Sequence, residues 1–340
     1  MTGRDATAGT EDYLSLRPLL FSIAYRMLGS VADAEDIVQE AFLRYHRASS
    51  AAGEPESPKA YLSAVTTRLC IDHARSARVR RESYVGEWLP EPLLTGTPAA
   101  AASGPAAPAP LASAQIAPDP ADLAERADSL SMAFLLVLER LSPVERAVFL
   151  LHDVFSYSYD ETASIVGKSE ANCRQLARRA RQHVAEHRPR QEPSRRSREE
   201  LAGRFFAAVE RGDMDGLVEL LAADVEVHGD SGGMRPSWPR PITGRERVGR
   251  LLLSLAEQTR MAGASVVPAE INGQPGALFL DPEGRLVNVF SLEIADGAVQ
   301  MIRSVINRDK LRHLGPLADV QAMLRELRKP GEPPAGPPAG

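Results

Sequence analysis

The chain has 340 residues, of which 44% are hydrophobic and 25% are charged, which excludes disorder throughout and leaves room for two or three packed domains. The polar N-terminus and the lack of a long apolar run argue against a signal peptide and against a membrane span, so we expect a cytoplasmic protein. The two cysteines, Cys70 and Cys173, lie far apart in helix-like patterns. They suggest neither a disulfide framework nor a cysteine metal site, and we expect no cofactor.

The net charge of -5 conceals two basic blocks. Residues 58–82 hold six Lys or Arg side chains against two carboxylates, and residues 167–198 hold ten against three. Two basic blocks within an acidic protein indicate two contacts with a polyanion such as DNA, although solvated helix faces remain an alternative. The candidate DNA-binding residues of the first block are Arg68, Arg75, Arg78, Arg80 and Arg81.

Composition divides the chain into units. Of the 23 residues from 98 to 120, 16 are Ala or Pro, a composition that buries little surface and is typical of a linker. We expect folded units at 11–93, 121–187 and 198–315, with an Ala/Pro-rich linker over 94–120 and a largely disordered tail over 316–340.

Helical periodicity dominates the first unit. Apolar residues recur at helical spacing up to Leu28, and Gly29 stands where that helix should end. Residues 33–48 and 58–81 predict two further helices. The helix over 33–48 has an acidic face, which is either a docking surface or simple capping and solvation, with Asp33 well placed as the N-cap.

The second unit fits a helix-turn-helix. Counting from Tyr159, the small residue needed where two helices cross falls on Ala163, and the turn glycine falls on Gly167. Ser169 is a natural N-cap for the second helix, in which Cys173 and Leu176 would be buried. The exposed side chains of that helix are of the types that contact phosphates and base edges in the major groove. A hairpin used only for packing is the alternative. The candidate DNA contacts are Lys168, Asn172, Arg174, Gln175, Arg178 and Arg179.

The third unit changes from helical to alternating periodicity. Two amphipathic helices and a strand over 198–230 precede another helix near 243–258, and four alternating runs follow between 265 and 307, separated by Gly, Asp and Pro turns. Helices followed by an antiparallel sheet predict an α+β domain.

An apolar strip, YVGEWLPEPLL at residues 84–94, follows directly on the arginine-rich run. Its two prolines exclude a helix interior and a central strand, so it should be extended. One tryptophan and three leucines make it too apolar for an exposed linker. We therefore expect another part of the chain to cover the strip.

Four segments, in order, resemble extracytoplasmic-function (ECF) sigma factors that carry a C-terminal SnoaL-like extension. Residues 19–47, LLFSIAYRMLGSVADAEDIVQEAFLRYHR, resemble the start of sigma region 2, and residues 61–93 resemble the rest of it. Residues 141–184 resemble region 4, and residues 198–311, ending in NRDKL, resemble the extension. The resemblance implies a multidomain fold of two all-α sigma domains, a region 2 helical bundle and a region 4 helix-turn-helix, plus an α+β SnoaL/NTF2-like cone.

The resemblance also implies a function. The chain would be a non-enzymatic sigma factor that binds core RNA polymerase through the β′ clamp and the β flap and directs it to promoter DNA. The loop over 49–58 and the helix from Ala60 to Arg75 would capture and melt the minus-ten element. Region 4 would read the minus-thirty-five element as a duplex, and the flexible linker would let the two modules grip separate sites. In the family the β′ clamp binds the face that here holds Asp33, Asp36, Gln39 and Glu40.

We further expect the third unit to cover the strip and to regulate the chain in cis. The strip would contribute Tyr84, Trp88, Leu89 and Leu93, and the third unit would contribute Asp230, Gly232, Gly233, Asn307, Asp309 and Lys310. The chain departs from the family pattern at Ser231 and Met234, where glycine and lysine are usual, and at Glu87, where proline is usual.

The alternative function is a helix-turn-helix regulator fused to a small-molecule-binding or isomerase-like SnoaL domain. Such isomerases use a carboxylate base and a tyrosine oxyanion donor. All seven tyrosines lie at or before Tyr159, which leaves the third unit without a phenol. Asp224, Glu226 and His228 lie near one strand, where surface or core hydrogen bonding is the simpler role. An unknown small ligand in the third unit remains open.

Overall fold

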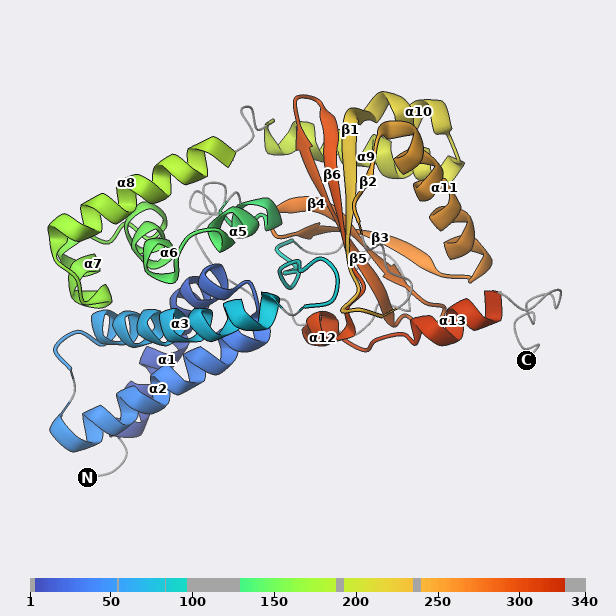
Figure 1. The fold of residues 1–340 in the computed structure, drawn as a ribbon. Coiled ribbons are helices and arrows are strands. Elements are labelled where there is room, and N and C mark those ends of the chain that lie inside the picture. The colour runs from blue at the N-terminus through green and yellow to red at the C-terminus, as the bar shows by residue number, and fades with distance from the viewer. Residues whose placement is uncertain are drawn as a thin grey trace, which may run out of the picture.

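The computed structural model describes residues 4–53, 55–82, 84–96, 129–187, 193–234 and 240–327. A helical half, formed by the N-terminal and middle segments, lies beside a C-terminal half built on a curved sheet (Figure 1). Within the described part of the chain, no helix combines the length and the apolar character needed to cross a membrane.

Three long helices form the first domain: α1 (Arg4–Leu28), α2 (Val31–Ala52) and α3 (Pro58–Glu82). The expected stop at Gly29 is confirmed, because this residue has a φ of 68°, which costs glycine no side-chain strain. The expected N-cap was wrong. Ser30 caps α2 by accepting a hydrogen bond from the Asp33 backbone, which places Asp33 within the first turn. A carboxylate there still favours the helix dipole.

The second domain is the expected helix-turn-helix with two preceding helices. Its elements are α5 (Met132–Glu139), α6 (Pro143–Phe149), the π-helical turn η2 (Leu150–Val154), α7 (Tyr159–Val166) and α8 (Glu170–His187). Gly167 ends α7 with a φ of 67°, and the Ser169 hydroxyl accepts from the Asn172 backbone at the start of α8. Ala163 and Cys173 are buried together between the two helices.

The two helical domains share one hydrophobic core. Leu135, Phe149 and Leu150 of the second domain belong to the same buried cluster as Leu20 and Leu62 of the first. Polar contacts also cross the boundary: the buried Arg26 donates to Ser129, and the Ser63 and Tyr157 hydroxyls lie 2.8 Å apart. Apolar faces of α1 and α3 are therefore buried against the second domain in this structure.

The C-terminal domain places helices on one face of a sheet. Its helices are α9 (Arg195–Arg211), α10 (Met214–Leu220) and α11 (Arg245–Met261), followed later by α12 (Arg308–Leu311), the turn η3 (Arg312–Leu314) and α13 (Val320–Leu327). Its strands are β1 (Leu221–Asp230), β2 (Ile242–Thr243), β3 (Ser265–Ile271), β4 (Gln274–Leu280), β5 (Leu286–Ala295) and β6 (Ala298–Val305).

The sheet has the order β2-β1-β6-β5-β4-β3 and is mixed. The α+β class is confirmed, but a wholly antiparallel sheet was wrong, since β1 pairs parallel with β6. The crossover through α11 carries the chain to the far edge at β3, and the hairpins that follow bring β6 back beside β1 in the same direction. Phe205 of α9 and Leu217 of α10 fill the helix-covered face together with Phe290, Leu292 and Ile302.

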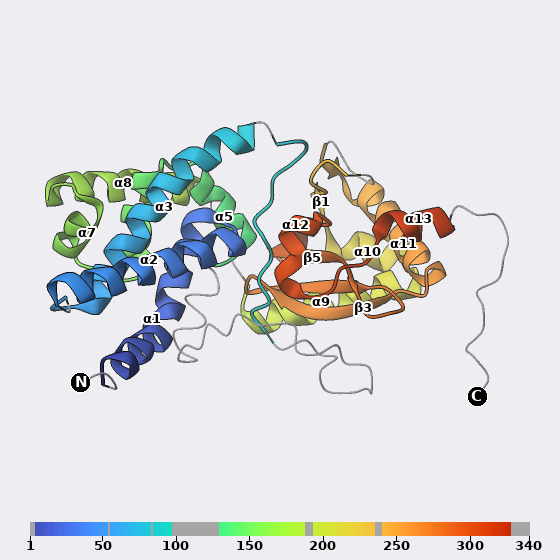
Figure 2. The same cartoon turned by 90° about the horizontal axis from the view of Figure 1, so that it is seen from below.

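The apolar strip is extended, as its prolines predict, and lies between the helical half and the sheet (Figure 2). Leu94 pairs antiparallel with Ile271 at the end of β3, and the Thr95 backbone donates to Glu270. The strip thus extends the sheet beyond its edge strand β3, whose unpaired backbone groups would otherwise face solvent.

Some expected boundaries differ from the observed ones. Helix α1 begins at Arg4 rather than near residue 11, and α9 begins at Arg195 rather than at 198. The expected tail begins inside the folded domain, because Leu286 pairs with Leu317 and α13 follows. Nearly all of the Ala/Pro-rich linker, from residue 97, and the rest of the tail, from residue 328, lie outside the described residues.

Candidate nucleic-acid interface and interdomain contact

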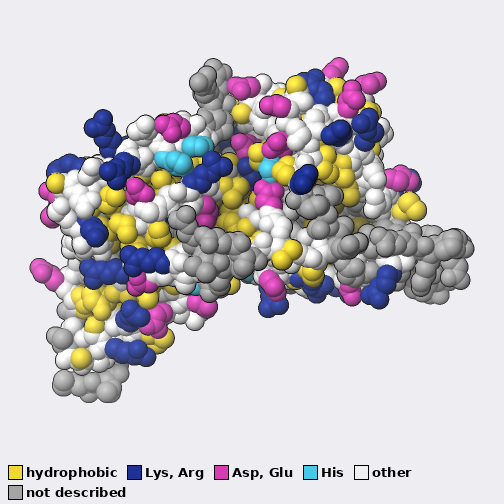
Figure 3. All heavy atoms as spheres, viewed as in Figure 1, with side chains coloured by type: hydrophobic (Ala, Val, Ile, Leu, Met, Phe, Trp, Pro, Cys, Tyr) yellow, Lys and Arg dark blue, Asp and Glu magenta, His cyan; other side chains and the backbone are white. Residues whose placement is uncertain are grey.

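Helix α8 exposes one polar and basic face. Cys173, Ala177 and Ala180 are fully buried against the rest of the domain. Lys and Arg side chains lie at the surface over α7 and α8 (Figure 3). Arg174 pairs with Glu170 and lies over the Tyr159 ring, whose centroid is 5.1 Å away. The exposed set contains every candidate of this region: Lys168, Asn172, Arg174, Gln175, Arg178 and Arg179.

The basic candidates of α3 are placed differently. Arg68 donates to the backbone oxygens of Ser164 and Ile165, each at 2.9 Å, so it binds the C-terminal end of α7 instead of facing solvent freely. Cations are favoured at that end of a helix. Arg75 is exposed and pairs with Asp72 at 3.2 Å. The side chains of Arg78, Arg80 and Arg81 lie outside the described residues.

The acidic face of α2 is accessible. Asp36 and Gln39 are exposed, whereas Asp33 and Glu40 are partly buried. Asp33 lies 3.4 Å from the His73 ring, and Glu40 pairs with Arg44 at 2.7 Å. All four side chains come from one helix, so this face could be recognised from sequence spacing alone.

A buried ion pair connects the C-terminal domain to the strip. Asp230, at the end of β1, accepts from Lys310 of α12 at 2.6 Å, and the two side chains are 0% and 8% exposed. Asp230 also accepts from the Leu89 backbone at 2.9 Å, and Lys310 donates to the Leu89 carbonyl oxygen. The Lys310 ammonium lies 4.3 Å from the Trp88 ring centroid. The backbone of the strip therefore forms hydrogen bonds with both Asp230 and Lys310.

Tyr84 extends this contact. Its hydroxyl donates to Asp230 and accepts from Asn307 at 2.7 Å. Burial, together with the hydrogen bond to Asp230, raises the pKa of the Tyr84 phenol, so the group stays protonated and can donate. The loop after Asp230 requires glycine at both positions, because Gly232 and Gly233 have positive φ and lie against Asn307 and Val85.

Two residues expected in this contact are placed elsewhere. Leu93 is buried in the core of the helical domains, while its neighbours Leu89 and Leu94 pack with the C-terminal domain. In an extended segment, successive side chains point to opposite sides, so Leu93 and Leu94 face different domains. The Asp309 side chain is 75% exposed and pairs with Arg312 within the C-terminal domain.

Asn272 joins three parts of the chain and was not expected from the sequence. It lies in the β3–β4 turn with a φ of 53° and is fully buried. Its amide donates to the Tyr25 hydroxyl at 2.7 Å and to the Leu130 carbonyl at 3.0 Å, and it accepts from the Leu93 backbone at 2.9 Å. The only sequence signal is the Asn-Gly pair, which predicts a tight hairpin and nothing about its partners.

Two glutamates of the strip were also missed. Glu91 caps α2 by accepting from the Val31 backbone at 2.7 Å and from the Ser30 hydroxyl at 3.0 Å. Burial raises the pKa of Glu91 above its ordinary value even though these hydrogen bonds oppose the shift. Glu87, which departs from the family pattern, lies 2.6 Å from one ring nitrogen of His228, and Glu226 lies 2.8 Å from the other. His228, itself on β1, thus connects this strand to the strip.

A pocket lies between the second and C-terminal domains. Its space is about 610 Å³ when its open mouth is included, and Met132, Phe134, His187, Arg198 and Arg303 are among its lining residues. Arg198 belongs to α9, and the remaining lining includes residues of α5, α8 and the strands β4, β5 and β6. Much of the helix-covered face of the sheet is filled by apolar side chains. Asp224 is exposed on β1. None of the three candidates Asp224, Glu226 and His228 is among the residues that line this pocket.

Comparison with known proteins identifies both helical domains. Residues 13–80 match the family model for Sigma-70 region 2, and residues 131–184 match that for Sigma-70, region 4. The ECF RNA polymerase sigma factor SigJ of Mycobacterium tuberculosis is 37% identical over 313 residues, which cover 88% of this chain and 92% of that protein. The chain belongs to the family of ECF RNA polymerase sigma factors.

The similarity extends beyond the two sigma regions. A probable ECF RNA polymerase sigma factor, SigI of the same species, is 32% identical over 297 residues, covering 87% of this chain and 92% of its own. The crystal structure of M. tuberculosis SigJ matches with a TM-score of 0.67 and 34% identity over 91% of this chain and 100% of that one. The expected family and sigma-factor function are confirmed, and the C-terminal domain is part of the shared architecture.

Proposed function

We propose that this sigma factor binds core RNA polymerase through the acidic face of α2, melts the minus-ten element with α3 and reads the minus-thirty-five element with α8. We propose also that the C-terminal domain regulates initiation in cis, by holding the two helical domains against each other. The observation that carries the regulatory part is the buried Asp230–Lys310 pair, whose hydrogen bonds are completed by the strip that follows α3.

The packed helical domains support a restrained state. Promoter elements a few helical turns apart require the two DNA-binding domains to separate. Here Arg68, on the helix assigned to melting, is bound to the end of α7, and Tyr157 contacts Ser63. Asn272 adds a bond from the C-terminal domain to Tyr25 of α1. Initiation would therefore begin with loss of these contacts on binding to polymerase.

Truncation tests the restraint. A chain ending at Arg188 lacks the C-terminal domain and should give a several-fold higher run-off yield with saturating core polymerase, because the contacts of that domain with the strip and with α1 are then lost. A chain ending at Leu327 keeps Lys310 and α13 and is the matched control, for which we expect a yield near that of the full chain. An unchanged or lower yield for the chain ending at Arg188 would contradict cis restraint.

Charge reversal tests the docking face. Asp36→Lys with Glu40→Lys should weaken core binding by at least 10-fold through lost ion pairs at the interface, while leaving the buried stripe of α2 unchanged. Glu219→Lys, at an exposed position of α10, is the matched control. Fluorescence anisotropy with labelled core polymerase measures the affinity of each variant. Equal affinity of the double reversal and the wild type would refute the assignment of this face of α2 to core binding.

Isomerase-like catalysis is less well supported. The helix-covered face of the sheet, where a conical domain would hold a substrate, is packed with Phe205, Leu217 and Leu292. Glu226 and His228 are bonded to each other and to the strip. These contacts favour a structural and regulatory role for the C-terminal domain.

A further inference from the structure

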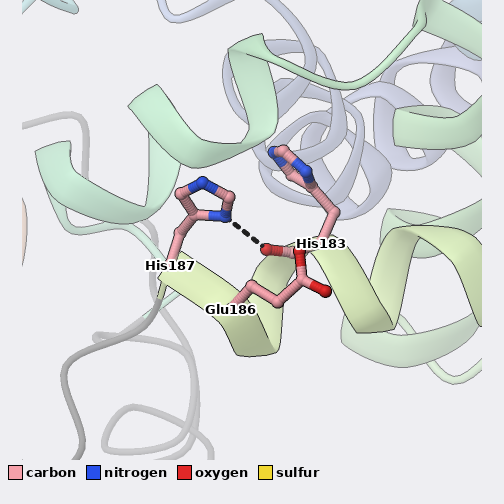
Figure 4. Close-up of side chains that lie close together, drawn as sticks. All are labelled: His183, Glu186 and His187. Atoms are coloured by element: carbon pink, nitrogen blue, oxygen red, sulfur yellow. Dashed lines mark hydrogen bonds between the residues drawn. The ribbon is translucent and has the colours of Figure 1, made fainter.

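Two histidines and a glutamate gather in the last turns of α8, after the candidate DNA contacts. His183, Glu186 and His187 occupy positions three and four apart, which places them on one side of the helix. Their ligand atoms lie within 4.8 Å of one another, and the two imidazole centroids are 4.4 Å apart. Figure 4 shows the rings and the carboxylate beside one another on this turn.

The hydrogen bonding of His187 leaves one ring nitrogen ready for a ligand. Its Nδ1 lies 2.8 Å from the His183 backbone oxygen (Figure 4). A carbonyl oxygen can only accept, so Nδ1 carries the proton and Nε2 of the neutral ring presents a lone pair. Histidines that bind metals typically donate their other ring N–H to a backbone carbonyl or a carboxylate in this way.

The other two side chains complete the arrangement. His183 Nε2 is buried and has no hydrogen-bond partner among the described residues, and an ion or water is a usual explanation for such a group. The Glu186 carboxylate accepts from Gln182 at 3.1 Å, which restrains it on the same side of the helix. Glu186 and His187 are both exposed, so an ion can reach them from solvent.

We propose that His183, Glu186 and His187 form a binding site for one divalent transition-metal ion of the Zn²⁺ class. Two imidazoles and a carboxylate are a ligand set that suits Zn²⁺, and water would supply the fourth ligand. Zn–N bonds of about 2.0–2.1 Å place tetrahedral ligand atoms roughly 3.4 Å apart. The ligand atoms now lie within 4.8 Å of one another, so a change of rotamer at the exposed Glu186 would bring its carboxylate toward the imidazoles while His187 keeps its hydrogen bond to the His183 backbone oxygen.

The site lies at the boundary between two domains. His187 also lines the pocket between the second and C-terminal domains, together with Arg198 of α9 and Glu293 of β5. Histidine side chains are visible over this end of α8, beside the hollow between the two halves (Figure 3). A bound ion would hold together the last turns of α8 at the point where this helix lies next to the C-terminal domain.

Metal titration of the full-length protein tests the proposal. The chelator-stripped protein is titrated with Zn²⁺ against a coloured chelator of known affinity, and we expect one ion per chain. His187→Gln and Glu186→Gln should each lower the affinity by about 10- to 100-fold or more. Both positions are exposed, so these variants leave the helix packing intact, which circular dichroism checks. Co²⁺ in place of Zn²⁺ should give visible absorption bands that His187→Gln abolishes.

His46→Gln is the matched control, because His46 is an exposed histidine on α2. It should bind Zn²⁺ as the wild type does. Equal Zn²⁺ affinity in the wild type and His187→Gln would overturn the site, as would equal losses in His187→Gln and His46→Gln. The experiment measures metal binding alone, so a negative result would overturn the metal site without bearing on the proposed sigma-factor mechanism.

Discussion

At the scale of single residues, the interdomain contact depends on a charge pair removed from water. Asp230 and Lys310 are almost fully buried, and each also hydrogen-bonds to the backbone of the strip at Leu89. A buried carboxylate is tolerated only while it is paired. The pair therefore couples the folding of the C-terminal domain to its docking on the strip.

Lys310→Met should destabilise this docking strongly. It removes the charge but keeps much of the apolar stem, leaving Asp230 buried and unpaired, which typically costs about 3–5 kcal/mol. Urea unfolding and limited proteolysis should both show the C-terminal domain released at a lower denaturant concentration. Lys168→Met, at an exposed lysine, is the control, and an equal effect of both variants would contradict a specific role for the pair.

His228 should make the same contact sensitive to pH. Burial disfavours its charge, yet the hydrogen bonds with Glu87 and Glu226 prevail and raise its pKa above the ordinary value near 6.5. Glu87 comes from the strip and Glu226 from β1, while Arg303 of β6 opposes the shift. Because the pKa is raised in the docked state, the added stability is complete below the pKa of the undocked histidine. It is lost as pH rises through the docked pKa.

His228→Gln should abolish this dependence. In the wild type, resistance of the strip to protease should decrease as the pH rises from about 6 to above the docked pKa, whereas His228→Gln should give a flat profile. Glu87→Gln, which removes one partner, should reduce the slope. Protease profiles of the wild type and His228→Gln that run in parallel would show that another group titrates.

At the scale of elements, α8 packs against the domain with one face and presents its candidate DNA contacts on the opposite face. Its small buried residues pack on α6 and α7, and its exposed side is polar and basic. The spacing of buried and exposed residues lies within one helix, so counting from Tyr159 was enough to predict both its buried and its exposed face. The first basic helix, α3, could not be interpreted in the same way, because Arg68 has its partners on α7.

Arg178→Ala should weaken recognition of the upstream promoter element by the polymerase-bound sigma factor. If Arg178 reads a base, its loss should cost about 1–3 kcal/mol of binding free energy and relax the sequence specificity. If it binds phosphate, its loss should mainly reduce the salt dependence of binding. Arg211→Ala, at an exposed position of α9, is the control. Footprints and affinities of Arg178→Ala equal to those of the control would contradict the assigned orientation of α8.

At the scale of the whole molecule, the strip is the element that all three domains contact. Leu93 packs into the shared core of the helical domains, Leu89 and Leu94 pack into the C-terminal domain, and Trp88 lies between Lys310 and Gly29. This arrangement explains why so apolar a segment follows the arginines of α3. Its surface is covered from both sides.

Trp88→Ala should loosen the whole assembly. Loss of a half-buried indole and its cation–π contact should cost roughly 2 kcal/mol, raise protease sensitivity of the strip and change the run-off yield without altering a candidate DNA contact. Val85→Ala is the control on the same strip, since Val85 is 70% exposed. If Trp88→Ala matched Val85→Ala in proteolysis and transcription, the strip would not be what joins the domains.

Most of the local structure could be predicted from the pattern of residues along the chain. Helical spacing located α1–α3 and the helix-turn-helix, alternation located β3–β6, and prolines kept the strip extended, since each signal is completed within a few residues of chain. The tertiary structure alone decided the partners. Tyr25 and Asn272 are 247 positions apart, and Arg68, Glu91 and Leu93 have local patterns that suit several environments. Which one each occupies depends on how the domains pack, because burial and hydrogen bonding between distant segments leave no periodicity in the chain.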